Sequence, residues 1–299
     1  MRYIRTERAD SVVDSTPADN KTIIVITPTK QRPERLADLT MLAQTLKQVG
    51  NLYWVVVEDA DKTADLVSDL LARTGINHTY LATTNHGLPC RGWAQRNLAL
   101  DYLRQNKDKF NEKDVIYFAD DDNGYDLRLF DQYIRKVDVM GVWAVGIPGN
   151  ALVEAPKVEN GKVVGWHSAY LPDREFATDM AGFALNFGLV VSTNASWSLK
   201  CAGNFPEQCF LKQLNLSRSD LEPFGWESDK KPILVWHRQT APAPDQPFDL
   251  MGYMAEYRLP QDEICKKFQQ IHLMTYEQAE AIAKEYGPVE SESKNEVKS

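Results

Sequence analysis

Three consecutive aspartates, Asp120, Asp121 and Asp122, are the residues of this sequence best suited to chemistry. They directly follow residues 115–119, an apolar and aromatic stretch that is typical of a buried strand. If strand geometry continues through them, Asp120 and Asp122 point to the same face. Three adjacent carboxylates repel one another, and Mg²⁺ or Mn²⁺ would neutralise them while also binding substrate phosphate oxygens. The pattern predicts a metal–diphosphate site; the alternative is an acidic surface turn before a helix that begins at Asp126.

The elements that position these aspartates are predicted by an alternation of strands and helices. Strands are expected at residues 22–26, 53–57, 78–81 and 115–119, and helices at residues 32–49, 65–72 and 91–104. Thr27, Pro28 and Thr29 are expected to end the first strand. Short connections indicate a mainly parallel sheet with right-handed crossovers, in which ligands bind at the carboxyl ends of the strands. Residues 22–125 are therefore interpreted as a nucleotide-binding half, although the chain has no dinucleotide-binding glycine motif after the first strand and no P-loop.

The later part of the chain has a different pattern. It predicts a helix at residues 126–137, a strand at 142–146, a hairpin turn around Asn160 and Gly161, a helix at 206–214 and a last strand at 233–236. We expect an α/β fold with a polar lead-in at residues 1–21, the nucleotide-binding half at 22–125, a smaller mixed half at 126–250 and a C-terminal extension at 251–299. The Ser-, Glu- and Lys-rich end of that extension is expected to be disordered.

Composition argues against several classes of protein. The net charge is −8 and no basic stripe is present, so a nucleic-acid partner is not expected. No apolar run approaches the ~18 residues that span a bilayer. Residues 1–21 are polar and lack a signal-peptide pattern. The chain is therefore expected to be cytosolic or a soluble piece of a longer protein.

Four cysteines and three N-glycosylation sequons bear on the compartment. Cys90, Cys201, Cys209 and Cys265 have no zinc-site spacing. Cys201 and Cys209 could pair, but four cysteines allow three pairings and the sequence does not choose among them. The sequons begin at Asn77, Asn194 and Asn215, and they matter only in a secretory compartment.

Six short motifs in a fixed order give the chain a family resemblance. They are Val25-Ile26-Thr27-Pro28-Thr29, Val57-Glu58-Asp59-Ala60, Arg91-Gly92 with Gln95-Arg96-Asn97, Tyr117-Phe118-Ala119-Asp120-Asp121-Asp122-Asn123, Asp179-Met180-Ala181-Gly182-Phe183 and Leu234-Val235-Trp236-His237. Together they resemble the β-1,3-glucuronosyltransferase family, glycosyltransferase family 43, from about residue 22 to residue 240. The resemblance implies a GT-A type α/β fold, with a mainly parallel central sheet, helices on both faces and a smaller acceptor-binding half.

The resemblance also implies roles for residues that bind a UDP-sugar donor. Asp122 would hold Mn²⁺, which acts as a Lewis acid on the diphosphate leaving group. Asp121 would bind the ribose and Asp120 the donor sugar. The other implied donor-binding residues are Pro28, Asp59, which would bind the uracil, Arg91, Arg96, Arg174 and His237.

Each of these residues also has a structural interpretation. Asp59 could be a helix N-cap, and Arg91 with Arg96 could form a solvated helix face. A single histidine such as His237 is more often structural, although its position at a strand end favours function. An arginine is a bidentate partner for the carboxylate of a glucuronate donor, which favours the functional interpretation of the two arginines.

The second half would bind the acceptor through Glu154 and Asp179, and Glu207 resembles the catalytic base. A carboxylate can remove the proton from an acceptor 3-hydroxyl if its pKa lies near the working pH. Without the family, Glu207 is simply an acidic residue in a first helical turn. Trp166 and Trp197 could stack on sugar rings, although tryptophans are more often in the core.

One motif departs from the family pattern. The family reads Trp-His-x-Arg-Thr, whereas this chain reads Trp236-His237-Arg238-Gln239-Thr240, so Gln239 fills the arginine position. Arg238 could replace that arginine, but on a strand its side chain would face the other way.

The resemblance implies an inverting, Mn²⁺-dependent transfer of glucuronic acid from UDP-glucuronate to the 3-hydroxyl of a terminal galactose. It further implies a homodimer, a Golgi-lumen location and an N-terminal membrane anchor in a full-length protein that is not present in this chain. The alternatives are a relative that uses another donor such as UDP-xylose, a haloacid-dehalogenase-type phosphatase, and an inactive glycan-binding module.

Overall fold

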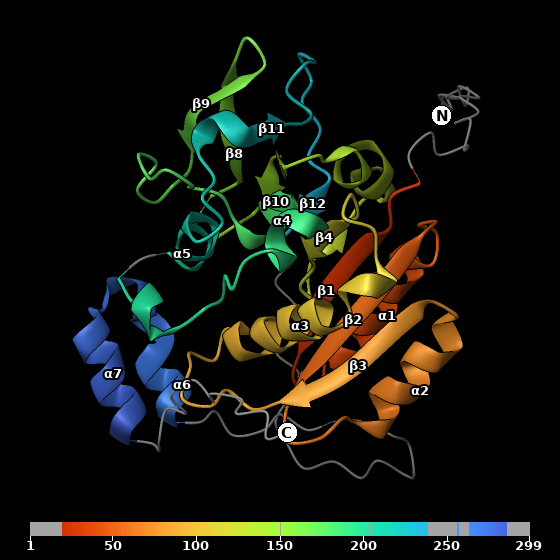
Figure 1. Ribbon diagram of the computed structural model, residues 1–299, viewed down its shortest axis with the longest axis vertical. Helices are drawn as coiled ribbons and strands as arrows, with labels where there is room; N and C mark the ends of the chain where they lie inside the picture. The colour runs from red at the N-terminus through yellow and green to blue at the C-terminus, as the bar shows by residue number, and fades with distance from the viewer. Residues whose placement is uncertain (1–19, 150, 204, 239–255, 257–262, 286–299) are drawn as a thin grey trace, which may run out of the picture.

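The computed structural model describes residues 20–149, 151–203, 205–238, 256 and 263–285. This part of the chain forms two sheets (Figure 1). The larger sheet has seven strands in the order β11 (Leu221–Pro223), β6 (Met140–Val142), β10 (Phe183–Asn186), β4 (Val115–Phe118), β1 (Ile23–Thr29), β2 (Leu52–Asp59) and β3 (Asn77–Thr83). The smaller sheet has the order β5 (Gly124–Tyr125), β12 (Val235–Trp236), β7 (Val145–Gly146), β8 (Val153–Glu159) and β9 (Lys162–His167).

The first four strands of the larger sheet are parallel, as predicted. β1 pairs in parallel with both β2 and β4, and β2 pairs in parallel with β3. β10 runs antiparallel to β4 and β6, so the sheet as a whole is mixed. Because β4 pairs with β10, the larger sheet continues across residue 125, where the two expected halves meet.

Helices cover both faces of the larger sheet, which confirms the predicted α/β architecture. α1 (Arg35–Leu46) and α2 (Asp65–Thr74) pack on one face, and α3 (Trp93–Gln105) packs on the other (Figure 1). Alternate residues of β1 serve the two cores: Ile23 faces α1 and α2, and Ile24 faces α3. Burial of both faces explains why the strands of this half are almost entirely apolar.

The remaining helices are short. The α-helices are α4 (Phe187–Val191), α5 (Pro206–Lys212), α6 (Glu263–Lys267) and α7 (Tyr276–Glu285). The 3₁₀ turns are η1 (Lys107–Lys109), η3 (Ile134–Lys136), η4 (Met180–Gly182), η5 (Leu199–Cys201), η6 (Arg218–Asp220) and η7 (Phe268–Leu273). The helix expected at residues 126–137 is instead a π-helical turn, η2 (Leu129–Tyr133), followed by η3.

Two expected strands differ from the structure. β1 continues through Thr29 instead of stopping before Thr27. Pro28 has no backbone N–H to donate, and it fits within the strand because β4 ends opposite Ile26 and leaves that flank of β1 unpaired. The single strand expected at residues 142–146 is two strands, β6 and β7, which belong to different sheets.

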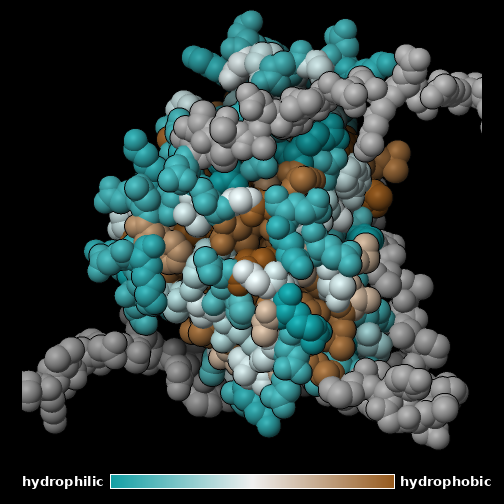
Figure 2. Space-filling model, turned by 90° about the vertical axis from the view of Figure 1, so that its right-hand side faces the viewer, coloured by the Kyte–Doolittle hydropathy of each residue, from teal (hydrophilic) through white to brown (hydrophobic). Residues whose placement is uncertain are grey.

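Hydrophilic residues dominate the face of the molecule shown in Figure 2, and apolar residues are visible in patches, the largest of them toward the middle of the view. Among the described residues, no helix has the length and apolar character needed to cross a membrane. The expectations for the lead-in up to residue 19 and for the chain end after residue 285 lie outside the described residues.

Candidate active site

A cavity of about 450 Å³ opens where the carboxyl ends of β1, β2 and β4 meet. This position follows from the parallel pairing of these strands, because their carboxyl ends share one edge of the sheet. Most of the predicted site residues line the cavity: Pro28, Asp59, Arg91, Arg96, Asp120, Asp121, Asp122, Asp179, Glu207 and His237. Glu154 and Arg174 do not.

The three aspartates lie in a turn and not on a strand. β4 ends at Phe118, and the backbone N–H of Asn123 donates to the carbonyl of Asp120 at 3.4 Å. The expectation that strand alternation places Asp120 and Asp122 on one face is therefore wrong, since the turn itself brings all three aspartates to the cavity. Asp121 is buried and Asp122 is exposed.

Asp121 is held by residues that the sequence analysis missed. Arg32 donates to both carboxylate oxygens of Asp121, at 2.9 and 3.0 Å, and the Thr29 hydroxyl donates to Oδ2 at 2.7 Å. Burial raises the pKa of Asp121, and Arg32 and Thr29 oppose that rise. Any contact between Asp121 and a ribose therefore adds to this set of hydrogen bonds. The position of Arg32 just after the first strand is the one signal in the sequence that could have identified it.

Asp120 is paired with Arg96. The guanidinium of Arg96 donates to Asp120 Oδ1 and, through Nη1, to the backbone carbonyl of Arg91 at 2.7 Å. Gly92 lies between the two arginines with φ of +72°, and a Cβ there would lie 2.7 Å from Arg96 Nη1. The glycine is therefore required both for the left-handed turn and for the approach of Arg96.

His237 and Asp179 form a pair on the opposite wall. Nε2 of His237 lies 2.9 Å from Oδ1 of Asp179. This hydrogen bond raises the pKa of His237, and the nearby charges of Asp120 and Asp122 add to the effect. His237 is thus favoured in its cationic form, which suits an anionic ligand.

Glu207 lies in the first turn of α5 and lines the cavity. Burial and, to a smaller extent, the charge of Asp179 raise the pKa of Glu207 to about 7, against the opposing charges of Arg174 and Arg96. Because an efficient general base has a pKa near the working pH, this position can remove a proton from a bound hydroxyl.

Arg174 and Glu154 lie beside the cavity. The guanidinium of Arg174 stacks over the ring of Phe205 at 3.7 Å and donates to the carbonyl of Tyr170 at 3.2 Å. Glu154 Oε1 accepts from Ser168 Oγ at 2.8 Å. Arg174 remains close enough to Glu207 for their charges to interact.

Asp59 ends β2 and is not a helix N-cap, since α2 begins at Asp65 after Ala64. Asn85 Nδ2 donates to Asp59 Oδ1 at 3.1 Å, and Lys30 Nζ lies 3.3 Å from Oδ2. Lys30 lines the cavity and is a second residue that sequence analysis missed.

Arg238 points away from the cavity lining. Its guanidinium pairs with Asp38 on α1, and its Nε donates to the backbone carbonyl of Asp122 at 3.3 Å. Arg238 therefore supports the aspartate turn, and its guanidinium is engaged by Asp38. Gln239 lies outside the described residues.

The acidic turn fits a divalent cation through Asp122. Although Asp122 is exposed at the surface, the protein atoms packed around its carboxyl hinder solvation, and together with the charges of Asp121 and Asp120 they raise its pKa to about 6. The described residues contain no group of three or more potential ligands arranged around a metal. The arrangement fits Mg²⁺ or Mn²⁺, which bind one or two protein carboxylates and complete their coordination with phosphate and water.

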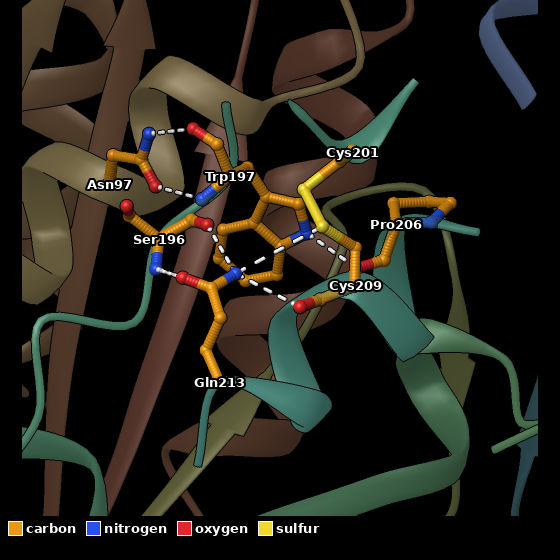
Figure 3. The surroundings of a disulfide bond; sticks show 7 residues. All are labelled: Asn97, Ser196, Trp197, Cys201, Pro206, Cys209 and Gln213. Atoms are coloured by element: carbon orange, nitrogen blue, oxygen red, sulfur yellow. Dashed lines mark hydrogen bonds between the residues drawn. A yellow bond between two sulfur atoms is a disulfide. The ribbon is translucent and has the colours of Figure 1, made fainter. Parts of the chain in front are cut away.

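The two tryptophans considered for sugar stacking belong to the core. Trp166 and Trp197 are 2% and 1% exposed. Trp197 stacks on Phe210 at 4.2 Å, and its indole N–H donates to the Pro206 carbonyl at 2.9 Å (Figure 3). The ring thus supports the start of α5, next to Glu207, but cannot contact a bound sugar.

The four cysteines form two disulfides, Cys90–Cys265 and Cys201–Cys209. The second bridges η5 to α5 across Trp197, as Figure 3 shows. Fold and cavity together are those of an α/β enzyme that binds its ligand at the carboxyl ends of parallel strands.

Comparison with known proteins agrees with the family resemblance. Residues 42–241 match the model of glycosyltransferase family 43. Human galactosylgalactosylxylosylprotein 3-beta-glucuronosyltransferase 2 is 44% identical over 229 residues, which cover 73% of this chain and 69% of the relative. Human galactosylgalactosylxylosylprotein 3-beta-glucuronosyltransferase 1 is 42% identical over 234 residues, with the same coverage. Among solved structures, residues 1–349 of S. aureus TarS give a TM-score of 0.48 at 18% identity, over 73% of this chain and 60% of that one.

The chain belongs to glycosyltransferase family 43, and it is a glycosyltransferase. This membership confirms the resemblance identified in the sequence and excludes the dehalogenase-type phosphatase alternative.

Proposed function

We propose that the protein transfers glucuronic acid from UDP-glucuronate to the 3-hydroxyl of a terminal galactose, with inversion at the anomeric carbon. The observation that carries the proposal is the carboxyl of Glu207, which lines the cavity with its pKa raised to about 7. The names of the relatives support the donor sugar and the acceptor class.

Glu207 is proposed as the general base. Its ionised carboxylate takes the proton from the acceptor 3-hydroxyl as that oxygen attacks the anomeric carbon from the side opposite the diphosphate. The transition state carries oxocarbenium-like positive charge, as in glycoside hydrolysis. The raised pKa of Glu207 makes it a stronger base than an exposed glutamate, while leaving it largely ionised just above neutral pH.

The cations around the cavity are proposed to bind the donor. Arg91 and the protonated His237 compensate the diphosphate charge, and Arg96, oriented by Asp120, supplies donors for the sugar carboxylate. Asp59 accepts from the uracil N–H, Asp121 binds the ribose, and Pro28 borders the nucleoside.

Asp122 is proposed as the protein ligand of Mn²⁺. When bound, the metal supplies Lewis-acid stabilisation of the diphosphate leaving group. The chain contributes the carboxylate of Asp122 and a backbone that is supported by Arg238.

The acceptor is proposed to bind beside Glu207, through Asp179 and Glu154. Only Asp179 lines the cavity, so Glu154 is expected to contact the acceptor beyond its terminal sugar, while Arg174, whose charge acts on Glu207, is proposed to contact the donor sugar from beside the cavity. We further propose a homodimer in the Golgi lumen. Two disulfides support an oxidising compartment, and the sequon asparagines at positions 77, 194 and 215 are exposed.

The test is release of UDP from UDP-glucuronate, measured with and without Mn²⁺ and with and without a galactose-terminated acceptor. Turnover that requires both Mn²⁺ and acceptor is expected. Turnover with UDP-xylose but not with UDP-glucuronate would replace the proposed donor. No turnover with any UDP-sugar, in protein that still binds UDP, would contradict the assignment of acceptor or base.

A further inference from the structure

The C-terminal helical segment, residues 263–285, lies beyond residue 241, where the family match ends. It consists of α6, η7 and α7, the blue elements of Figure 1, which lie beside α3 and the region of η5. Phe268 and Ile271 of this segment are each 1% exposed and join the same core as α3. The segment is thus packed into the molecule, next to the active site.

On one side the segment is fastened to the arginine-bearing loop. Cys265 is disulfide-bonded to Cys90, which lines the cavity. The guanidinium of Arg91 donates through Nη2 to the backbone carbonyl of Gln269 at 2.7 Å. The backbone carbonyl of Arg91 in turn accepts a hydrogen bond from Arg96. The segment therefore holds Arg91 directly and Arg96 through Arg91.

On the other side the segment is fastened to the chain that leads into α5. The backbone N–H of Gly203 donates to the carbonyl of Ile271 at 3.2 Å. The ring of His272 lies 6.4 Å from that of Phe205 and 5.9 Å from that of Tyr170, measured between ring centroids. Phe205 is two residues before Glu207 and carries the stacked guanidinium of Arg174.

We propose that this segment is a brace that sets the position of Arg91 relative to Glu207. Arg91 and Glu207 lie on separate parts of the chain, and residues 263–273 contact both of those parts. The inference rests on the proposed function in taking Arg91 as a donor-binding residue and Glu207 as the base. It adds Cys265 and His272 as positioning residues that lie outside the family match.

Two substitutions separate the two ends of the brace. Cys265→Ser breaks the disulfide to Cys90 and so frees the loop that carries Arg91. The Kd of UDP in the presence of Mn²⁺ and the KM of the donor should both rise about tenfold, which is the effect of losing one hydrogen bond to a charged group. His272→Ala removes the contacts to Phe205 and Tyr170, so kcat should fall about threefold with the Kd of UDP unchanged, for a loss of less than ~1 kcal/mol in a ring contact. Lys284→Ala is the matched control, since this exposed residue of α7 pairs with Glu280 on its own helix.

Hydrogen exchange of the substrate-free enzyme provides a readout that does not depend on the reaction. In Cys265→Ser, the backbone amides of residues 91–93 should exchange faster, and in His272→Ala those of Phe205, Glu207 and Gln208 should exchange faster. Unchanged exchange in both variants, or a donor KM that matches the wild type in Cys265→Ser, would overturn the brace. If the wild type fails to use UDP-glucuronate, the proposed function fails, while exchange still decides whether the segment positions the two site regions.

Discussion

Two carboxylates of the cavity differ in how their charge is compensated. Asp121 is 5% exposed and accepts hydrogen bonds from Arg32 and Thr29, whereas the charge of Glu207 is compensated by a backbone hydrogen bond and by the charges of Arg174 and Arg96. A carboxylate with a bidentate arginine is held in one orientation. Burial raises the pKa of both carboxyls, but hydrogen bonds from Arg32 and Thr29 oppose the rise at Asp121, whereas the pKa of Glu207 reaches about 7, which suits proton exchange near neutral pH. Asp121 therefore anchors the aspartate turn, and Glu207 is suited to catalysis.

Glu207→Gln should lower kcat by about 10²- to 10⁴-fold, the range of a lost general base, and leave UDP binding intact. In the wild type the base must be ionised, so kcat should fall about tenfold per pH unit below the raised pKa of about 7. This acid limb should be absent from the residual activity of the variant. Measured kcat–pH profiles check both points, with Glu175→Gln as the control, since Glu175 is a half-buried glutamate that pairs with Lys212 and does not line the cavity. A variant that keeps the acid limb would assign the proton transfer to another group.

Arg32→Met should be strongly destabilising, because it leaves the buried Asp121 without its ionic partner. Removing one partner of a buried pair costs about 3–5 kcal/mol, and part of that loss is avoided here if Asp121 takes up a proton. The matched control is Arg128→Met, which breaks an exposed ion pair with Asp126 and should cost about 1 kcal/mol or less. Urea unfolding of both variants gives the comparison. Equal free energies of unfolding would show that Asp121 does not depend on Arg32.

At the level of elements, the sequence predicts well the strands and helices that carry the site, but it predicts poorly the contacts between residues far apart in the chain. The strand before Asp120 is visible because four residues of β4 are buried on both faces, which demands a continuous apolar run. The pairing of Arg32 with Asp121 joins residues 89 apart, and no local pattern encodes such a pairing. Residues 142–146 read as one strand because periodicity does not show to which of two sheets a residue pairs.

The α3 N-terminus depends on Gly92, which permits a test of an element and its site together. Gly92→Ala should cost about 1 kcal/mol of stability from its positive φ, and it should also raise the KM of the donor, because the new Cβ displaces Arg96. Gly75→Ala is the matched control. Gly75 has φ of +71° with no atom within 4 Å of an added Cβ, so it should show the same stability loss with normal kinetics.

Thermal unfolding and donor KM of the two glycine variants give the comparison. If Gly75→Ala changes the donor KM as much as Gly92→Ala does, the effect comes from general loosening and not from Arg96.

At the scale of the whole molecule, the two disulfides tie together very different lengths of chain. Cys90–Cys265 joins residues 175 apart, whereas Cys201–Cys209 joins residues 8 apart. The longer bridge connects the loop before α3 to the last of the described segments, residues 263–285, and the shorter one only fixes η5 to α5 (Figures 1 and 3). Neither pairing could be chosen from the sequence, since all three connectivities of four cysteines have plausible spacings.

The two bridges should therefore contribute unequally to stability. In the chain-entropy account, loss of Cys90–Cys265 costs about 5 kcal/mol and loss of Cys201–Cys209 about 2.5 kcal/mol, because a longer closed loop restricts the unfolded chain more. Urea unfolding of Cys265→Ser and Cys209→Ser measures this difference, with dithiothreitol-treated wild type expected to lose more than either. If Cys209→Ser loses more free energy of unfolding than Cys265→Ser, residues 263–285 stay docked without their disulfide. The packing of Phe268 and Ile271, and not the disulfide, would then hold the segment against the active site.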